Sequence, residues 1–479
     1  KMIPSAPGTK LKDALEEGME LQKEYESNTT AKEVIDLALQ IEGTVFNVGT
    51  HAAGVVISKD PLTDIMPIQL SKDGQVISQY QMADLEQIGL LKMDFLGLRN
   101  LTIINKTVRL IEETQDKKID MDYPPLDDQP VYEMLTAGDT DGVFQLESSG
   151  MKALVRDLKP SVFDDMGALV ALYRPGPLNS GMVKSFVNRK HGREEVTYLH
   201  PLLEPILKDS YGTIVYQEQI MQIAQSLAGY SLGQADLLRR AMGKKKAEVM
   251  EKERANFLKG AIENQVDETL ANQLFDTMSE FAAYCFNRSH SAAYAFVAFQ
   301  TAYLKTHYPV EYLSALLSSV QSSLEKIQHY IVTAQRMGIS VLPPDVTRSG
   351  LDFTPDGKAI RFGLASVKGV GESVVETIVE KRDQQPFESL EDFLKRMDAK
   401  VLNRKTLESL TLSGALDAFA FKRKHLFDNI DTMIRFAERA REQAETGQVN
   451  LFAALSAGGG NNSGNNFGGL MLAGNADEE

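Results

Sequence analysis

The sequence contains a single cysteine, Cys285, among its 479 residues. An intrachain disulfide is therefore excluded, and a reducing compartment fits this composition. No apolar run reaches the roughly 18 residues that a membrane-spanning helix needs. No signal peptide is visible at the N-terminal end.

Basic residues are also in deficit, because 51 Lys and Arg face 66 Asp and Glu, which gives a net charge of -15. This balance argues against a protein coated with basic groups. A local basic groove can still lie on an acidic body, so nucleic acid is not excluded as a partner. The length and the ordinary apolar fraction of 43% indicate a globular chain of about two to four domains.

The short apolar stretch at residues 88–98 contains one cation, Lys92, and one carboxylate, Asp94. Gly89 and Gly97 bracket the stretch, which is too short for a helix and predicts a buried strand. Residues two apart lie on the same face of a strand. A metal ion and a phosphate together would use this pair, whereas an ordinary ion pair or a cap is the commoner alternative.

The segment around this strand, residues 45–98, predicts one small sheet. Lys72-Asp73-Gly74 fits a hairpin turn between two further strands, and residues 55–57 fit a strand core. His51 could bind phosphate or metal, although a structural hydrogen-bonding role is commoner for a lone histidine. Upstream, residues 9–41 have the spacing of two amphipathic helices, separated by the polar residues 28–30.

From residue 99 to about residue 330 the pattern is mainly helical. Residues 142–151 contain a serine pair near a predicted helix start, where backbone N–H groups can bind anions. Residues 171–177 predict a tight loop, because Pro175 and Pro177 fix the backbone and Gly176 permits close approach. Such a loop would hold Arg174 in a binding wall; the alternative is a helix-ending turn with an exposed arginine.

The main basic feature lies at residues 237–246. Its five cations are Arg239, Arg240, Lys244, Lys245 and Lys246. Gly243 would end a helix there and leave the lysines at its C-terminal end, where cations complement the helix dipole. The same cations beside an apolar seam also fit a grip on a triphosphate or a DNA backbone, and both interpretations stay open.

Aromatic residues in the segment 281–296 alternate with Asn287, Arg288, Ser289 and His290. This mixture suits a stacked base and a phosphate. The Ser-His pair is not a hydrolase motif, because neither a third member nor a nucleophile elbow is visible. Cys285 is interpreted as a small buried residue rather than a reactive thiol.

The segment after residue 340 changes character, and residues 343–345 predict a linker. Gly369-Val370-Gly371, ahead of a helix predicted over residues 372–382, is typical of a helix-hairpin-helix motif. Backbone N–H groups in this motif can hold a DNA phosphate without reading bases, and Lys368 adds a charge. A second, weaker copy is predicted at residues 403–417, followed by a charged helix at residues 421–446.

A short peptide near the C-terminal end contains Gln448, Leu451 and Phe452. The Gly/Asn/Ser-rich stretch at residues 458–469 follows it and predicts disorder. A Leu-Phe pair ahead of a flexible tail suits insertion into a partner's pocket. The alternative is that these apolar side chains fold back onto the preceding helix.

Five motifs of this sequence occur together in a known family and in this order. They are LKMDFLGLR at residues 91–99, VFQLES at 143–148, YRPGP at 173–177, LRRAMGKKK at 238–246 and FNRSHSAAY at 286–294. On these motifs the chain closely resembles the C family of bacterial replicative DNA polymerases, the DNA polymerase III alpha subunits. The resemblance extends over about residues 1–452.

The resemblance implies an α+β, mainly α-helical fold. A small polymerase-beta-like palm sheet, large helical fingers and a helix-hairpin-helix domain are its expected parts. The implied domains are the end of the thumb at residues 1–45, the second part of the palm at 46–98, the fingers at 99–335, a clamp-binding domain with tandem helix-hairpin-helix at 336–455, and a disordered tail at 456–479.

By the same resemblance, Asp94 matches a catalytic aspartate that binds Mg, and Lys92, Arg239 and Arg240 match triphosphate-binding positions. The remaining expected nucleotide-binding residues are Arg174, Asn287, Ser289 and His290. The expected DNA-binding residues are Lys244, Lys245, Lys246, Lys368, Gly369 and Gly371. Gln448, Leu451 and Phe452 resemble the family's sliding-clamp peptide.

The implied activity is template-directed DNA synthesis by a two-metal mechanism. Its partners would be primer-template DNA, deoxynucleoside triphosphates, a sliding clamp and other replicase subunits, in the cytoplasm and without a membrane. The family's two further catalytic aspartates, in a Pro-Asp-Phe-Asp-type motif, do not occur in this sequence. One carboxylate cannot hold two Mg ions, so we expect this chain alone to be inactive. The alternative is a non-catalytic fragment that binds DNA and the clamp, and a first residue of Lys1 rather than Met fits a fragment or a processed chain.

Overall fold

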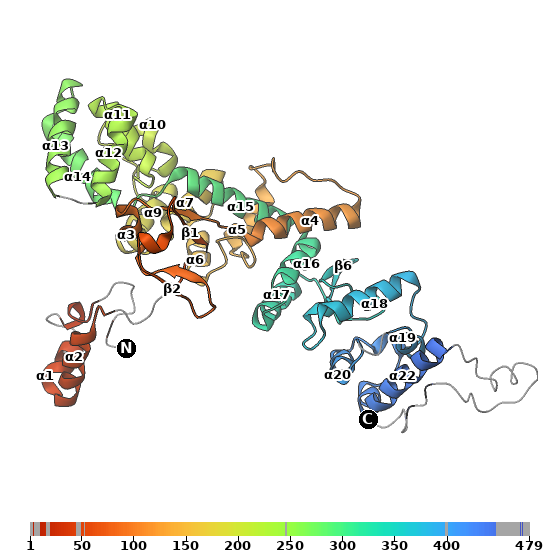
Figure 1. The fold of residues 1–479 in the computed structure, drawn as a ribbon. Helices are drawn as coiled ribbons and strands as arrows, with labels where there is room; N and C mark the ends of the chain where they lie inside the picture. The colour runs from red at the N-terminus through yellow and green to blue at the C-terminus, as the bar shows by residue number, and fades with distance from the viewer. Residues whose placement is uncertain are drawn as a thin grey trace, which may run out of the picture. The chain divides into compact units, whose positions relative to one another are not determined.

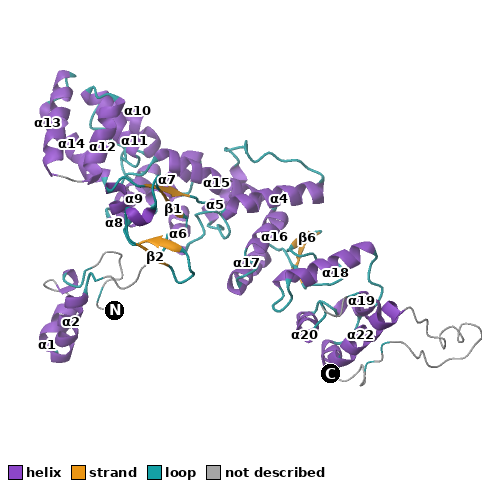
Figure 2. Ribbon diagram, in the orientation of Figure 1, coloured by secondary structure: helices purple, strands orange, loops and turns teal. Residues whose placement is uncertain are grey.

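The computed structural model describes residues 3, 10–15, 20–44, 49–51, 53–244, 247–397, 401–446, 470 and 472 (Figure 1). The chain divides into two compact units, Lys1–Gly97 and Leu98–Glu479. Helices make up most of the described structure, and the strands are short (Figure 2). The predicted mainly α-helical fold with small sheets is therefore confirmed.

The first unit begins with a helical hairpin and continues with short strands. Its elements are η1 (Asp13–Leu15), α1 (Glu20–Ser27), α2 (Thr29–Ile41), β1 (Gly54–Ile57), η2 (Leu62–Asp64), β2 (Ile68–Leu70), β3 (Val76–Ser78), α3 (Met82–Gln87) and β4 (Leu91–Asp94). Asn28 separates α1 from α2 because its side chain accepts hydrogen bonds from the N–H groups of Thr30 and Ala31. Leu21 and Ile35 form the small core of this hairpin with Ala14.

The predicted single sheet at residues 45–98 is wrong in one respect, because the described strands form two separate two-stranded sheets. β1 pairs antiparallel with β4, and Gly54 lies opposite Asp94 in this pairing. β2 pairs antiparallel with β3. The predicted hairpin turn joins β2 to β3, with Gly74 at a φ of +77° that a side chain rarely adopts.

The strand predicted within residues 88–98 is confirmed as β4, but its predicted burial is wrong. Leu91 is 58% exposed, Met93 41% and Phe95 63%. The strand predicted at residues 55–57 is confirmed as β1, although Val55 and Ile57 are exposed as well. A two-stranded sheet is too small to bury its own faces.

The second unit contains the helical body. Its helices are α4 (Arg99–Gln115), α5 (Gln129–Ala137), α6 (Ser149–Leu158), α7 (Phe163–Leu172), α8 (Pro175–Asn179), α9 (Met182–Lys190), η3 (Pro201–Leu203), α10 (Glu204–Leu207), η4 (Lys208–Ser210), α11 (Gln217–Ala228), α12 (Leu232–Lys244), α13 (Ala247–Glu263), α14 (Glu268–Ala282), α15 (Arg288–His307), α16 (Pro309–Ser319) and α17 (Leu324–Arg336). α15 packs against α4, α5, α7 and α16 (Figure 1). Its buried residues, Phe299 and Ala302 among them, lie in the main core. A second core joins α11 to α14 around Phe257 and Phe275.

The C-terminal part of this unit contains β5 (Val341–Leu342), β6 (Thr354–Asp356), β7 (Ala359–Arg361), η5 (Leu364–Ser366), α18 (Glu372–Gln384), α19 (Leu390–Arg396), α20 (Arg404–Ser413), η6 (Asp417–Phe419), α21 (Arg423–Asp428) and α22 (Ile430–Thr446). The strands form one sheet in the order β5-β7-β6. Residues 343–345, which are predicted as a linker, have no regular secondary structure, and Pro344 is buried. Val346 is fully buried and its N–H donates to the Ala415 carbonyl at 2.9 Å, so the chain is packed here.

Three local predictions need correction. The residues Pro175, Gly176 and Pro177 are not loop but begin α8, since proline is tolerated in the first helical turn. Gly243 does not end α12, which continues to Lys244. The charged helix predicted at residues 421–446 is divided into α21 and α22.

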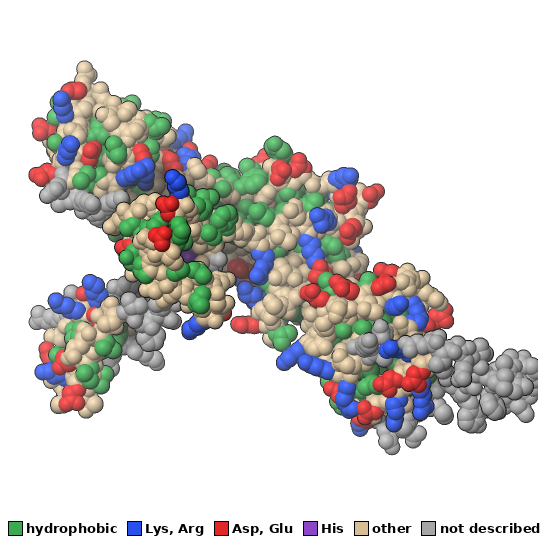
Figure 3. All heavy atoms as spheres, in the orientation of Figure 1, with side chains coloured by type: hydrophobic (Ala, Val, Ile, Leu, Met, Phe, Trp, Pro, Cys, Tyr) green, Lys and Arg blue, Asp and Glu red, His purple; other side chains and the backbone are tan. Residues whose placement is uncertain are grey.

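On the visible face, acidic and basic side chains are interspersed (Figure 3).

Candidate functional site

A compact polar group lies on the β1–β4 pair of the first unit. Lys92 Nζ is 2.9 Å from Asp94 Oδ1, and the two side chains share one strand face, as their spacing predicts. His51 Nδ1 lies 4.0 Å from the same oxygen and accepts a hydrogen bond from the Ala53 N–H at 3.2 Å. The Lys92 side chain is only 14% exposed, whereas the Asp94 side chain is 43% exposed.

The absence of a side chain at Gly54 makes room for this group. A Cβ at Gly54 would lie 2.6 Å from Lys92 Cε, 3.0 Å from His51 Nδ1 and 3.2 Å from Asp94 Oδ1. The three polar side chains therefore converge on the space in front of the glycine. The strand pairing produces this convergence, because it sets Gly54 directly opposite Asp94.

The described residues around Asp94 supply too few ligands for a complete magnesium site. Among the described residues there is no group of three or more His, Cys, Asp or Glu side chains that could hold a metal ion. Asp94 offers one accessible carboxylate, and Mg requires near-octahedral oxygen ligation. The described residues alone thus do not form the expected metal site.

In the second unit, the starts of α11 and α15 lie side by side. Tyr216 and Phe286 form a parallel β-bridge just ahead of the two helices, and the Gln217 N–H donates to the Phe286 carbonyl at 2.8 Å. Asn287 caps α15, because its side chain accepts from the His290 N–H at 2.8 Å. Two helix N-termini in one place favour a negative charge.

A carboxylate of the chain already occupies this position. Glu218 accepts hydrogen bonds from Asn287 Nδ2 at 3.0 Å and from the Arg288 N–H at 2.9 Å. Sequence reasoning missed Glu218, because its contact with α15 depends on the bridge between distant segments. The arrangement shows that the start of α15 can hold an anion.

Arg239 and Arg240 both bind Asp236 on the same helix. Arg239 Nη2 is 2.7 Å from Asp236 Oδ1, and Arg240 Nη2 is 2.7 Å from Oδ2. Hydrogen bonds from Arg239 hold the pKa of Asp236 below its usual value. Arg239 Nη1 also donates to Gln217 Oε1 at 3.2 Å, which brings Arg239 to the start of α11.

Arg174 and His290 meet on one aromatic ring. The Arg174 guanidinium lies 4.5 Å from the centroid of Phe286, and the His290 ring lies 5.4 Å from it. Arg174 also donates to the Tyr284 carbonyl at 2.7 Å, and burial lowers the pKa of its guanidinium. The half-buried Arg174 is therefore held firmly, whereas Ser289 and His290 are exposed.

Cys285 lies next to this group and is buried, as predicted. Burial raises the pKa of its thiol to about 12, so the thiol stays protonated near neutral pH. The predicted burial of Cys285 is confirmed, and a raised pKa agrees with a structural role. The second unit thus brings Arg174, Arg239, Asn287 and His290 around the starts of α11 and α15.

The expected DNA-binding residues lie in two places. Lys368 and Gly369 are exposed, Gly369 has a φ of +93°, and Gly371 is the N-cap of α18. A Cβ at Gly369 would meet Ser409 Oγ of α20 at 2.6 Å, so the turn packs on the second predicted copy. Lys245, Lys246, Gln448, Leu451 and Phe452 lie outside the described residues, and only the backbone of Lys244 is described.

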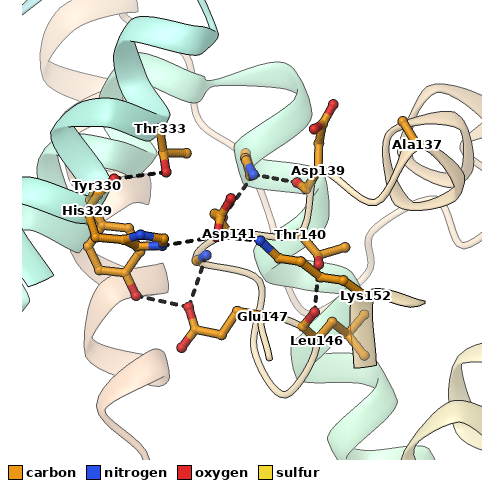
Figure 4. A network of polar contacts seen from close by, with 12 residues as sticks. Ala137, Asp139, Thr140, Asp141, Leu146, Glu147, Lys152, His329, Tyr330 and Thr333 are labelled. Carbon is orange, nitrogen blue, oxygen red and sulfur yellow. Dashed lines mark hydrogen bonds and ion pairs between the residues drawn. The ribbon is translucent and has the colours of Figure 1, made fainter. Parts of the chain in front are cut away.

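A polar network that sequence reasoning did not find connects α6, α15 and α17, and its Asp141 and Lys305 are buried (Figure 4). Asp141 accepts from Lys152 Nζ at 2.6 Å and interacts with His329 Nε2 at 3.0 Å. Lys305 Nζ donates to the Asp141 carbonyl at 2.8 Å. Burial lowers the pKa of Lys305 to about 8. These contacts join residues up to 188 positions apart, so no local sequence pattern marks them.

Helix N-termini, arginines and a glycine turn ahead of a helix are features that bind phosphate groups in many proteins. Family models match three segments. The bacterial DNA polymerase III alpha NTPase domain matches residues 1–97, the finger domain of the same subunit matches residues 100–265, and a helix-hairpin-helix motif matches residues 338–426.

The chain is also similar to curated DNA polymerase III alpha subunits. It is 48% identical to the subunit of Thermus aquaticus over 95% of this chain and 38% of the relative. It is 45% identical to the subunit of Bacillus subtilis, over 94% of this chain and 40% of the relative. It is 44% identical to the subunit of Escherichia coli K12, over 95% of this chain and 40% of the relative. The chain belongs to the family of bacterial DNA polymerase III alpha subunits and spans about two fifths of the length of these relatives. Among the described residues, no helix is long and apolar enough to cross a membrane.

Proposed function

We propose that this chain is part of a template-directed DNA polymerase and supplies one of its catalytic carboxylates, Asp94. The observation that supports this most is the convergence of Lys92, Asp94 and His51 in front of Gly54. A carboxylate can ligate a metal ion and an ammonium can bind a phosphate, so a metal-bound phosphate would use both groups of this pair. Asp94 would contribute one ligand to the Mg site of the complete polymerase, whose other carboxylates lie outside the described residues.

The cations around the starts of α11 and α15 are proposed to bind the incoming deoxynucleoside triphosphate. Arg239 and Arg240 would move from Asp236 to the phosphates, because a triphosphate has more charge than one carboxylate. Phe286 lies next to this anion position with Arg174 over its ring and His290 beside it, so aromatic and cationic groups are close to the proposed nucleotide. Asn287 and Ser289 complete the proposed nucleotide-binding set.

The remaining proposals concern DNA and the replicase. The exposed turn of Lys368, Gly369 and Gly371 ahead of α18 suits a backbone phosphate of primer-template DNA, with the lysines at residues 244–246 as a second grip. Gln448, Leu451 and Phe452 are proposed to bind a sliding clamp. Other replicase subunits and a cytoplasmic location follow from the same proposal.

A second candidate function is a non-catalytic module that binds DNA and the clamp. The absence of a metal-binding group among the described residues favours it for this chain on its own. Primer extension separates the two candidates. We expect the complete polymerase to lose extension with Asp94→Asn while it retains DNA binding, and the 479-residue chain alone to show no extension. Normal extension by the Asp94→Asn polymerase would refute the catalytic assignment.

A further inference from the structure

A pocket of about 720 Å³ lies between α6 and α9 in the second unit. One residue of α8, Leu178, also lines it. The lining is otherwise a rim of charged and polar side chains over an aliphatic floor. These residues are Leu154, Arg156, Asp157, Lys159, Leu178, Val183, Lys184, Val187, Asn188, His191 and Arg193.

The charge of this pocket is strongly positive. Arg156, Lys159, Lys184 and Arg193 face one carboxylate, Asp157. Within the described part of the chain, none of these four cations is in an ion pair; Arg156 donates only to the Ala137 carbonyl, at 3.3 Å. Glu194, beside Arg193 in sequence, is itself bound to Arg189 at 2.7 Å and so does not neutralise the pocket.

Four cations against one carboxylate give this pocket a positive charge, although the whole chain has a net charge of -15. Like charges that line one pocket repel each other, and an anion from outside would relieve this repulsion. The cations are exposed, which keeps them available to such a ligand. This distribution points to a partner with several negative charges.

The aliphatic side chains at the floor of the pocket indicate which class of anion the pocket suits. Leu154, Val183 and Val187 are buried members of the main core, and Leu178 is 42% exposed at the pocket edge. An aliphatic surface below a basic rim suits a ligand with an apolar part next to its phosphates, as in a nucleotide. A bare inorganic anion would leave the exposed Leu178 without a contact.

The position of α8 links this pocket to the proposed nucleotide site. Arg174 is the N-cap of α8 and contacts Phe286, whereas Leu178 lies four residues later and lines the pocket. Four residues of helix span only about 6 Å. A strand of nucleic acid that passes one end of α8 would therefore come within reach of the other.

We propose that the basic pocket between α6 and α9 binds the phosphates of a polynucleotide strand. Lys184 and Arg193 hold the phosphates, and the floor of Leu154, Leu178 and Val183 contacts the sugars or bases. The pocket contains none of the residues assigned to nucleotide transfer. This proposal therefore stands or fails independently of the catalytic role of Asp94.

Lysine footprinting tests the site without any substitution. The complete polymerase is treated with an acetylating reagent, with and without single-stranded oligodeoxythymidylate, and acetylation is measured by peptide mass spectrometry. We expect the oligonucleotide to protect Lys159 and Lys184 but not Lys326, an exposed lysine of α17. Parallel arms with free dTMP distinguish a strand from a mononucleotide as the source of the phosphate.

Two double variants, each of which removes two positive charges, test how much the pocket contributes to oligonucleotide binding. Lys184→Ala with Arg193→Ala should weaken oligonucleotide binding about three- to tenfold. The slope of the salt dependence should fall by about 0.7 for each phosphate that the variant no longer neutralises. The control is Lys326→Ala with Arg336→Ala on α17, where both side chains are exposed. Fluorescence anisotropy gives both quantities, and circular dichroism verifies the fold.

Three outcomes would overturn the proposal. One is equal acetylation of Lys159 and Lys184 in the presence and absence of oligonucleotide. Another is an equal loss of oligonucleotide affinity in the pocket variant and in the α17 control variant, which would indicate a general effect of charge. The third is protection by poly-glutamate but not by oligodeoxythymidylate, which would assign the pocket to an acidic protein segment.

Discussion

Gly54 lies directly opposite Asp94 across the β1–β4 pair, and a Cβ at this glycine would lie 3.2 Å from the Asp94 carboxylate and 2.6 Å from Lys92 Cε. The glycine is thus a condition for the approach of Lys92 to Asp94. Its φ lies outside the left-handed region, so the requirement is for space and not for backbone freedom.

Replacement of Gly54 by alanine should displace the Lys92 and Asp94 side chains from each other. We expect primer extension by the complete polymerase to fall by about tenfold or more, since misplacement by 1 Å can cost up to about 100-fold. Gly49→Ala is the matched control, because a Cβ there would have no neighbour within 4 Å. Similar activities of the two variants would contradict a functional role of this space.

Removal of the arginines that bind Asp236 should weaken nucleotide binding. Arg239→Ala and Arg240→Ala are each expected to raise the KM for deoxynucleoside triphosphates about tenfold, because each loses charge-assisted hydrogen bonds to phosphate. Steady-state primer extension measures this value. Arg254→Ala is the control, since Arg254 pairs with Asp276 of the neighbouring α14. An unchanged KM with altered DNA affinity would reassign the arginines to DNA.

The buried ammonium of Lys305 should make stability depend on pH. Burial lowers its pKa to about 8, below the 10.5 that is usual for lysine. The unfolded chain therefore binds more protons between about pH 8 and pH 10.5, and the contribution of Lys305 to stability rises with pH over this window. Below pH 8 both states are protonated, and the full penalty, on the order of 3 kcal/mol, is present.

Urea unfolding of wild type and Lys305→Met from about pH 7 to about pH 10 checks this sign. The free energy of unfolding of the wild type should rise relative to the variant as the pH increases. Lys326→Met, at an exposed position of α17, is the control and should show no such trend. A difference that stays constant with pH would show that Lys305 does not titrate in this range.

The peptide that contains Gln448, Leu451 and Phe452 should anchor a sliding clamp. Leu451→Ala with Phe452→Ala is expected to cost at least about 2 kcal/mol of binding free energy, since two apolar side chains would leave a pocket. Surface plasmon resonance against the clamp measures the loss. Val449→Ala with Asn450→Ala, at the two positions between Gln448 and Leu451, should have little effect on clamp binding. A larger loss of affinity in this control than in the Leu451→Ala and Phe452→Ala variant would reject the peptide as the anchor.

Local sequence patterns were sufficient for the secondary structure that depends on neighbouring residues. The glycine turn at residues 72–74, the β4 strand with Lys92 and Asp94 on one face, and the helix after Gly371 follow from backbone preferences and side-chain periodicity. The burial of Cys285 was also predicted from its residue type. These features require no knowledge of distant segments.

Tertiary structure decided how segments far apart in the chain meet. Glu218 reaches Asn287 only because Tyr216 pairs with Phe286, and Asp141 reaches His329 only because α17 packs beside the loop after α5. Burial was decided at the same level: β4 is apolar in sequence yet exposed, since a two-stranded sheet has no second layer of its own. The basic pocket between α6 and α9 likewise exists only in the folded chain, because folding brings cations from separate segments to one place.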